Sequence, residues 1–485
     1  MNLARIAEGH PDDAVALVEQ AGTLTYGRLR SQVGALRAVL AGRGVAPGDR
    51  VAIVAGNEAR FVEAYLAIVG LGAIAVPLNP SSPRPELERE MAAVGSRVVV
   101  AGRRVDLRAV PGADGLGPDE VDGLAGEHRA AVPVVDVASE AVAVLVFTAG
   151  TAGEPKAAML THANLASNIE QVQQLAERRL TADDRSLGVL PLFHIFGLNV
   201  VLGVSLAAGA SVVLVDRFDP TATLEVVRSR GCTVVAGAPP MWAAWLALPG
   251  APADAFATVR LATSGASPLP PEVAAAFRAR FGIGLDEGYG LTEASPVVTS
   301  SVGRARPGSI GQPLPGVTLR LVDGDGDDAL LGDSGEIWVR GPNVFPGYWE
   351  DAEATAAALT PDGWLRTGDL AVASDEGDLT IVGRSKDLII VSGFNVHPAE
   401  VERILLDHPG VRSAAVVGDD DPSTGETAHA FVVPHEGTTL ETSDVTGFCA
   451  ARLARYKCPT SVTVVAAIPT GLGGKVLRRR LGRAS

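Results

Sequence analysis

Short apolar runs alternate with longer amphipathic segments through the first part of the chain. Residues 50–55 and 73–76 are apolar runs of strand length, and residues 58–71 between them have the length of a helix. Ahead of them, five apolar residues recur at helical spacing and predict one helix face: Leu29, Val33, Leu36, Val39 and Leu40. Strands that alternate with helices favour mostly parallel sheets covered by helices.

The pattern changes near residue 380. A compact order of strand, helix, strand, strand, helix and strand follows, with a helix over 398–406 that has proline at its first position. Residues 428–433 and 462–466 read as strands. We therefore predict an α/β protein. It has a large N-terminal domain (1–383) of mostly parallel sheets flanked by helices, a hinge (384–386) and a small mobile α+β C-terminal domain (387–485).

One apolar segment resembles a membrane span. Residues 195–215 contain no charged residue and reach the length of a transmembrane helix. Gly197, Gly203 and Gly209 interrupt the segment, and residues 210–215 read as a buried strand that follows a helix. We predict no membrane-spanning segment, and residues 1–20 carry charges throughout without the apolar core of a signal peptide.

Composition and charge narrow the function. At 485 residues the chain exceeds the size of a single hydrophobic core, and its 47% hydrophobic content suits a globular protein. The net charge of −15 argues against nucleic acid or an anionic membrane as the main partner. The three cysteines (Cys232, Cys449 and Cys458) lack paired metal-ligand spacing, so neither a disulfide framework nor a zinc site is predicted. A reducing cytoplasm fits best.

The strongest candidate for chemistry is the segment Thr148 to Lys156, which reads Thr-Ala-Gly-Thr-Ala-Gly-Glu-Pro-Lys after an apolar strand at 144–147. Glycines let backbone amides approach an anion, threonine hydroxyls add donors, and the lysine adds a charge. The segment therefore suits phosphates, although its spacing differs from the common Gly-x-x-x-x-Gly-Lys-Ser/Thr loop. By itself, a flexible surface loop is an equal interpretation.

Four further segments indicate a function only when they are considered together. Residues 288–293 (Gly-Tyr-Gly-Leu-Thr-Glu) could place a ring on a heterocycle and a carboxylate near a metal. Residues 366–370 offer a carboxylate for ribose hydroxyls, and residues 383–387 and 471–475 each place a lysine after glycine. Singly, each is equally well explained as a buried or solvated turn.

These five segments, in this order and with these separations, resemble the adenylate-forming (AMP-binding) superfamily of acyl-CoA synthetases, luciferases and carrier-protein adenylation domains. The resemblance covers essentially the whole chain. Residues 190–197 (Leu-Pro-Leu-Phe-His-Ile-Phe-Gly) are similar to the fatty-acid and related acyl-CoA synthetase branch. The resemblance implies an AMP-forming acid–thiol ligase that uses ATP, Mg²⁺ and coenzyme A and proceeds through an acyl-adenylate.

The resemblance also implies roles for individual residues. Contacts to the ATP phosphates would come from Thr148, Thr151, Lys156 and Thr292. The adenine would lie against Gly265, Ala266 and Tyr289. The ribose would be held by Asp369 and Arg384. Four further positions are implied: Glu293 as the magnesium ligand, His194 as an aromatic gate beside the acyl pocket, Lys386 as the hinge and Gly393 beside the pantetheine tunnel. Lys475 would be the catalytic lysine that bridges the substrate carboxylate and the phosphate.

The substrate is expected to be a medium- or long-chain fatty acid or a similar apolar acid. Residues 234–241 and 263–267 occupy segments that line the acyl pocket in relatives, and they are small or apolar. Relatives that activate small dicarboxylates tend to place arginine where this chain has Gly288, so malonate-like acids are disfavoured. Two alternatives stay open: a ligase that loads a carrier protein in place of free coenzyme A, and a catalytically impaired homologue that binds nucleotide or acyl ligand. A homodimer is compatible with the sequence.

Two other charged stretches are predicted to be ordinary solvated segments rather than ligand sites. The acidic run 323–333 has Asp328 and Ser334 where a calcium loop needs glycine and glutamate, so a polar hairpin turn is predicted. The cluster Arg478–Arg480 with Arg483 is predicted to be a solvated basic tail.

The phosphate loop has Ala149 and Ala152 where the family usually carries hydroxyl residues, so two donors are absent. We predict that Ala149→Ser raises ATP affinity or the adenylation rate severalfold, because a hydroxyl restores one hydrogen bond to phosphate. Nucleotide-binding calorimetry and pyrophosphate release measure the two quantities. A variant equal to the parent protein in both would refute the interpretation.

Overall fold

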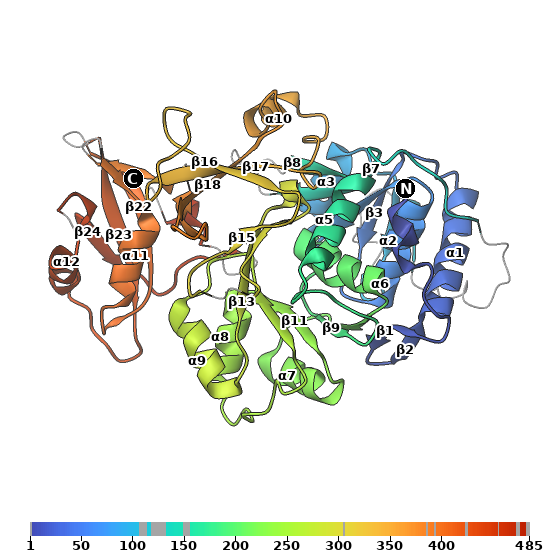
Figure 1. Cartoon of the computed structure of the whole chain (residues 1–485), viewed down its shortest axis with the longest axis horizontal. Coiled ribbons are helices and arrows are strands. Elements are labelled where there is room, and N and C mark those ends of the chain that lie inside the picture. The colour runs from blue at the N-terminus through green and yellow to red at the C-terminus, as the bar shows by residue number, and fades with distance from the viewer. Residues whose placement is uncertain are drawn as a thin grey trace.

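The computed structural model describes residues 2–105, 114–117, 132–148, 156–303, 306–384, 387–391, 394–421, 425–453, 455–471 and 476–481. Figure 1 shows the residues after about 390 (orange to red) gathered at one end of the long axis, beside the sheets and helices that precede them.

The largest sheet is mostly parallel, as predicted. Its strands are β1 (Val15–Glu19), β2 (Gly22–Thr25), β9 (Arg185–Gly188), β10 (Ser211–Leu214), β11 (Val234–Gly237), β12 (Leu261–Ser264), β13 (Asp286–Gly290), β14 (Val297–Ser300) and β15 (Gln312–Pro313). They lie in the order β15-β14-β13-β12-β11-β9-β10-β1-β2. Strands β1 and β9 to β13 are parallel, and β2, β14 and β15 run antiparallel to their neighbours.

A second sheet is parallel except at one edge. Its strands are β3 (Arg50–Val54), β4 (Ile74–Leu78), β5 (Val98–Ala101), β6 (Asp114–Leu116), β7 (Val142–Thr148) and β8 (Lys156–Thr161), in the order β6-β5-β3-β4-β7-β8. The strands β7 and β8 form an antiparallel hairpin. Strands predicted over 50–55 and 73–76 are confirmed as β3 and β4.

Helices cover these two sheets. They are η1 (Leu3–Ala7), α1 (Tyr26–Gly42), α2 (Ala59–Gly70), α3 (Arg84–Ala93), α5 (His162–Gln174), α6 (Val204–Ala208), α7 (Pro220–Ser229), α8 (Pro239–Ala247) and α9 (Pro271–Phe281). Both predicted helices are present, as α1 and α2. All twelve residues of α2 are buried, as expected for a helix whose apolar residues surround its axis. The α5 helix begins with a capping box between Thr161 and Asn164.

The third sheet is antiparallel, unlike the two mostly parallel sheets. Its strands β16 (Thr318–Val322), β17 (Ser334–Arg340), β18 (Leu365–Ala373) and β19 (Leu379–Arg384) are antiparallel throughout, and α10 (Ala352–Ala358) lies between β17 and β18 in the chain. Short connections such as 374–378 allow hairpins, whereas parallel pairs need a long crossover. The acidic run 323–333 connects β16 and β17, so the predicted hairpin is confirmed.

The C-terminal residues form a separate small core around Val396, Val401, Leu405, Val416 and Val432. The elements are β20 (Ile389–Val391), β21 (Phe394–Val396), α11 (Pro398–Leu406), β22 (Val411–Asp421), β23 (Gly425–Pro434), α12 (Thr442–Ala450), η7 (Arg455–Lys457), β24 (Ser461–Val464) and η9 (Arg478–Arg480). Among the described strands of this part, only β24 pairs in parallel, with β23. The domain boundary and the hinge stay predictions, because Ser385 and Lys386 lie outside the described residues.

Two further predictions can be compared with the structure. Residues 195–215 fold as the π-helical segment η4 (Phe196–Gly203), then α6, then β10, and within the described ranges no helix is long and apolar enough to cross a membrane. The solvated tail predicted at Arg478 is wrong. The guanidinium of Arg478 pairs with Glu402 at 2.7 Å and Asp387 at 3.3 Å, because those two carboxylates leave a negative niche that a planar cation fills.

His162 ties the N-terminus to α5 and makes stability depend on pH. Its Nδ1 accepts a hydrogen bond from the Leu3 N–H at 3.0 Å, the residue is 1% exposed, and burial lowers the pKa of the imidazole from 6.5 to about 4. The neutral ring is therefore favoured in the folded state. Its contribution to stability is present above pH 6.5 and decreases as the pH falls towards 4, by up to about 3 kcal/mol.

We predict that His162→Asn, which keeps an acceptor but does not titrate, removes this part of the pH dependence. Urea unfolding between pH 7.5 and 4.5 is the measurement. Tryptophan fluorescence reports on the large domain, since all five tryptophans lie between residues 242 and 364. Equal pH dependence in the two proteins would contradict the assignment.

Candidate active site

A cavity of about 660 Å³ lies where the three sheets of the larger part of the chain meet. Residues at the carboxyl ends of β12 and β13, residues of the β7–β8 hairpin, and residues 366–368 of β18 all contribute to its wall. Ligands of open α/β sheets bind outside the carboxyl ends of the strands, so this is the expected position for an active site. The volume is within the range of small-molecule sites.

The β7–β8 hairpin brings together the two ends of the predicted phosphate loop. Thr148 and Lys156 are directly paired across the hairpin, and the Thr148 hydroxyl donates to the Lys156 carbonyl at 3.4 Å. Both residues line the cavity. The Lys156 ammonium lies 5.4 Å from the centre of the Tyr348 ring, so it is held at the cavity by a cation–π contact. Thr151, Ala149 and Ala152 lie outside the described residues.

Tyr348 connects this lysine to the acidic end of the Gly-Tyr-Gly-Leu-Thr-Glu segment. Its hydroxyl donates to Glu293 Oε1 at 2.7 Å, while the Glu293 carbonyl accepts from the Phe345 N–H at 2.9 Å. Burial and the neighbouring Glu293 raise the pKa of Tyr348, which keeps the hydroxyl protonated as a donor. Thr292 and Glu293 form the short 3₁₀ turn η5 (Thr292–Ala294), and both line the cavity.

Tyr289, Asp369 and Arg384 form a second connected set. The Tyr289 hydroxyl donates to Asp369 Oδ2 at 2.8 Å, and Arg384 Nε pairs with Asp369 Oδ1 at 2.8 Å. Burial and the adjacent Asp369 raise the pKa of Tyr289 well above its ordinary value. Tyr289 and Arg384 line the cavity, while Asp369 is 5% exposed and lies behind the wall that residues 366–368 form. The predicted ribose and adenine residues are thus in mutual contact.

Gly265 and Ala266 follow β12 and line the cavity as predicted. A Cβ at Gly265 would stand 3.0 Å from the Phe196 ring, so glycine allows that ring to approach the turn. Ala266 has a φ of 73°, in the left-handed region that costs a non-glycine residue about 1–2 kcal/mol. Backbone held in such a conformation is concentrated at functional sites.

His194 borders the cavity beside Ile195 and Phe196. Its Nδ1 accepts a hydrogen bond from the Phe196 N–H at 3.3 Å. The residue is exposed to the cavity, yet the protein around it partly desolvates the ring, and this desolvation lowers the pKa of the imidazole. A neutral ring is therefore favoured at neutral pH, which suits a neighbour of an apolar acyl group.

Tyr348 and Glu336 are among the residues of the cavity wall that sequence reasoning missed. In the sequence, Tyr348 is marked only by the glycine that precedes it. Glu336 is one of several charged residues in a strand of alternating polar and apolar residues. In the structure Glu336 accepts from the Gly368 N–H at 2.8 Å and from Trp338 Nε1 at 3.0 Å. Because the Gly368 contact crosses from β18 to β17, no pattern within one strand could reveal it.

One segment that was predicted to line the acyl pocket does not border the cavity. Residues 263–266 line the cavity, but residues 234–241 do not. Val234 and Ala236 instead face a separate void of about 20 Å³. The space beside Gly237 is occupied by the Trp242 indole, which would lie 3.1 Å from a Cβ atom at residue 237. The apolar character of residues 234–241 therefore serves packing. Lys386, Gly393 and Lys475 lie outside the described residues, so their roles stay predictions.

The cavity residues fit a magnesium ion that is shared with a nucleotide. Among the described residues there is no cluster of three or more His, Cys, Asp or Glu side chains that could hold a metal alone. Magnesium in nucleotide enzymes usually takes one or two carboxylates together with phosphate oxygens and waters. Glu293, with the Thr292 hydroxyl beside it, supplies such a partial set.

Comparisons with known proteins identify relatives of this chain. A family model described as AMP-binding enzyme matches residues 3–349, and one described as AMP-binding enzyme C-terminal domain matches residues 400–475. A feruloyl-CoA synthase from Amycolatopsis sp is 38% identical and covers 96% of each chain. A long-chain-fatty-acid–CoA ligase from Bacillus subtilis is 32% identical over 97% of this chain and 91% of the relative. The solved structure of ATP-bound MatB from Rhodopseudomonas palustris has a TM-score of 0.92 at 33% identity, over 99% of this chain and 98% of that one.

The chain belongs to the AMP-binding enzyme family, the adenylate-forming superfamily that the five segments predicted. It is an AMP-forming CoA ligase, an acid–thiol ligase that uses ATP, Mg²⁺ and coenzyme A. The predicted fold class, enzyme class and cofactors are confirmed. The predicted substrate, a medium- or long-chain fatty acid or a similar apolar acid, is not settled, because the relatives include a feruloyl-CoA synthase as well as a long-chain-fatty-acid ligase.

We predict that Tyr348→Phe lowers kcat about 10-fold and raises the Mg²⁺ concentration needed for half-maximal rate. The variant keeps the ring beside Lys156 and loses only the hydrogen bond that orients Glu293. Steady-state pyrophosphate release against magnesium concentration is the measurement.

Tyr26→Phe is the matched control, since the Tyr26 hydroxyl is also buried but donates to the Ala210 carbonyl, outside the cavity wall. Identical magnesium dependence in Tyr348→Phe and the control would show that the contact does not position Glu293.

Proposed function

We propose that this CoA ligase activates a compact carboxylic acid with an apolar body, of about the size of ferulate, and transfers it to free coenzyme A. The observation that carries the proposal is the composition of the cavity beyond the nucleotide residues. That end is bordered by His194, Phe196, Thr263 and Gly288, and it reaches the buried guanidinium of Arg178. An aliphatic tail that met a buried charge would lose favourable contacts, so a long chain is the second candidate.

The geometry supports a division of the cavity into two parts. Lys156, Thr292, Glu293 and Tyr289 cluster at the nucleotide part, where Thr148 and Thr151 would add donors to the phosphates. Gly265 and Ala266 would border the adenine, and Asp369 with Arg384 would hold the ribose. A fixed set of donors and cations of this kind stabilises negative charge as it develops, without reorganising during the reaction.

The proposed reaction has two steps. A carboxylate oxygen forms a bond to the α-phosphorus of ATP, and pyrophosphate leaves. The coenzyme A sulfur then bonds to the acyl carbon after losing its proton, and AMP leaves with the former carboxylate oxygen. Lys475 would offset the repulsion between carboxylate and phosphate, and bound magnesium would offset phosphate charge. His194 would border the acyl group.

The two steps would use overlapping space, so the C-terminal domain would change position between them. Rotation at the hinge of residues 384–386, centred on Lys386, would remove Lys475 and bring Gly393 beside the pantetheine. The Bacillus subtilis relative, a long-chain-fatty-acid ligase, supports a medium- or long-chain fatty acid as the second substrate class.

Free coenzyme A is the proposed acceptor because the relatives of this chain are CoA ligases, and a carrier protein is the less favoured acceptor. The cytoplasmic location and the homodimer remain inferences from sequence.

We predict acid-dependent pyrophosphate release from ATP and magnesium, with thioester formed when coenzyme A is added. Ferulate, cinnamate and saturated acids of increasing length make up the panel, and Lys475→Ala should lower the adenylation rate at least about 100-fold. Adenylate without thioester would indicate a carrier-protein acceptor. Absence of release with every acid would overturn the proposed activity in favour of a binding homologue.

A further inference from the structure

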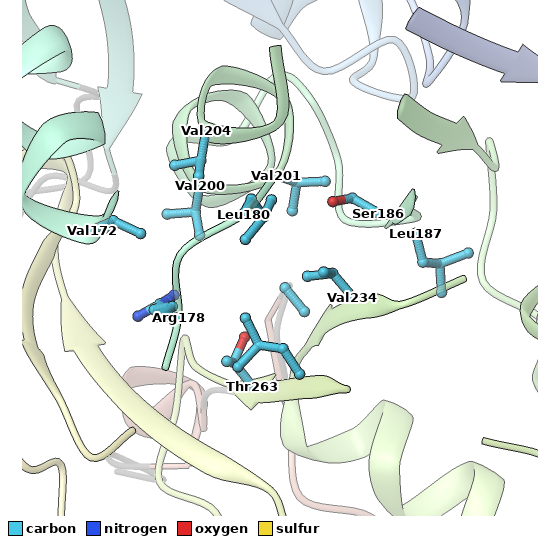
Figure 2. Close-up of a pocket in the computed structure, with 12 residues that line it drawn as sticks. Val172, Arg178, Leu180, Ser186, Leu187, Val200, Val201, Val204, Val234 and Thr263 are labelled. Carbon is cyan, nitrogen blue, oxygen red and sulfur yellow. The ribbon is translucent and has the colours of Figure 1, made fainter. Parts of the chain in front are cut away.

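Arg178 lies where no predicted site residue was expected. It belongs to the turn that follows α5, is 5% exposed, and lines both the large cavity and the void of about 20 Å³ behind it. Figure 2 shows its side chain beside the apolar side chains of Val172 and Val200, at the border of that void. The guanidinium therefore lies where the large cavity and the smaller void adjoin.

The Arg178 guanidinium has few hydrogen-bond partners although the side chain is buried. Within the described part of the chain it makes one hydrogen bond, a long one of 3.4 Å from Nη1 to Ser300 Oγ, although a guanidinium has five N–H donors. Asp286 attracts it electrostatically, but no ion pair between the two is present in the described structure. Leaving a buried charge so incompletely paired is costly.

The charge is nevertheless retained. Burial lowers the pKa of Arg178 to about 10, and Asp286 opposes this change, so the side chain is cationic at neutral pH. Burial raises the pKa of Asp286 to about 6, so this carboxyl is ionised only in part near pH 6 and is an incomplete counterion there.

Gly288 leaves the path to this cation open. A Cβ built at Gly288 would lie 3.9 Å from Arg178 Nη1, so the missing side chain exposes the guanidinium to the cavity. The neighbouring wall is apolar or neutral at Phe196 and Thr263. A ligand that extends from the nucleotide part past His194 would therefore meet one strong donor at its far end.

We propose that Arg178 is a specificity-determining residue that binds an oxygen acceptor at the end of the acid remote from the reacting carboxylate. The proposal rests on the proposed function, since it assumes that the acid occupies this part of the cavity. A phenol oxygen and a second carboxylate share the required chemistry. The substrate class is then a compact acid with an apolar body and a polar distal end, and a simple fatty acid is disfavoured.

The test compares three acids that differ only at the distal end: 4-coumarate (phenol), 4-carboxycinnamate (carboxylate) and cinnamate (hydrogen). The wild-type enzyme should prefer one of the first two over cinnamate by about 10- to 100-fold in kcat/KM, the effect of a hydrogen bond to a charged group. Arg178→Met should abolish this preference mainly through KM, with cinnamate little changed. Arg178→Lys should restore part of it, since lysine keeps the charge without the planar fork.

Arg37→Met is the control, because Arg37 is also buried at 7% exposed but donates to the Val132 carbonyl, outside the cavity wall. It should leave the ratio between the acids unchanged. Gly288→Val should lower the preference without removing the cation, and this variant tests the proposal if Arg178→Met fails to fold.

The outcomes separate the two proposals. Preference for the phenol or the carboxylate, lost in Arg178→Met, supports the inference and identifies the acceptor. Equal use of the three acids, or a preference that survives Arg178→Met, overturns it while the ligase stands. Failure of all three with active turnover of saturated acids also overturns it. No pyrophosphate release with any acid overturns the proposed function and the inference together.

Discussion

The Asp369 carboxylate accepts a hydrogen bond from Tyr289 and pairs with Arg384, each at 2.8 Å, so one buried group joins three strands of two sheets. Tyr289 belongs to β13 of the largest sheet, whereas Asp369 and Arg384 belong to β18 and β19 of the antiparallel sheet. The cavity opens at this junction, and the contacts fix the separation of its walls. Because Arg384 is the first residue of the predicted hinge (384–386), the same group couples the nucleotide part of the cavity to the start of the C-terminal residues.

The distribution of charge around the cavity explains how an acidic chain can bind anions. The net charge of −15 repels phosphate at long range, so binding depends on cations placed at the cavity. The cations Lys156, Arg384 and Arg178 all line the cavity, together with His194; in the proposed division the first two belong to the nucleotide part, and Arg178 belongs with His194 to the acyl part. Such an arrangement favours a ligand with negative or polar groups at both ends and an apolar middle, which an acyl-adenylate with a polar tail would match.

Much of this fold could be predicted from local pattern, and the exceptions have physical reasons. The helix over 398–406 was found with its bounds because proline marks its first turn, and β3 and β4 were found because buried parallel strands are continuous apolar runs. Site segments such as residues 288–293 were found because their glycines and polar residues are unusual together. Tyr348, Glu336 and Arg178 were missed because their importance comes from neighbours far away in sequence. The solvated tail assigned to Arg478 failed for the same reason, since Glu402 and Asp387 are remote along the chain.

The central claim is that the cavity aligns a carboxylate oxygen with the α-phosphorus of ATP. Its most direct test uses a free carboxylic acid that the enzyme accepts as substrate, with ¹⁸O at both carboxylate oxygens. Mass spectrometry locates the label after one turnover with ATP and coenzyme A. The account predicts one ¹⁸O in the phosphate of AMP and one in the thioester carbonyl. Label in orthophosphate or pyrophosphate, or AMP without label, would contradict it.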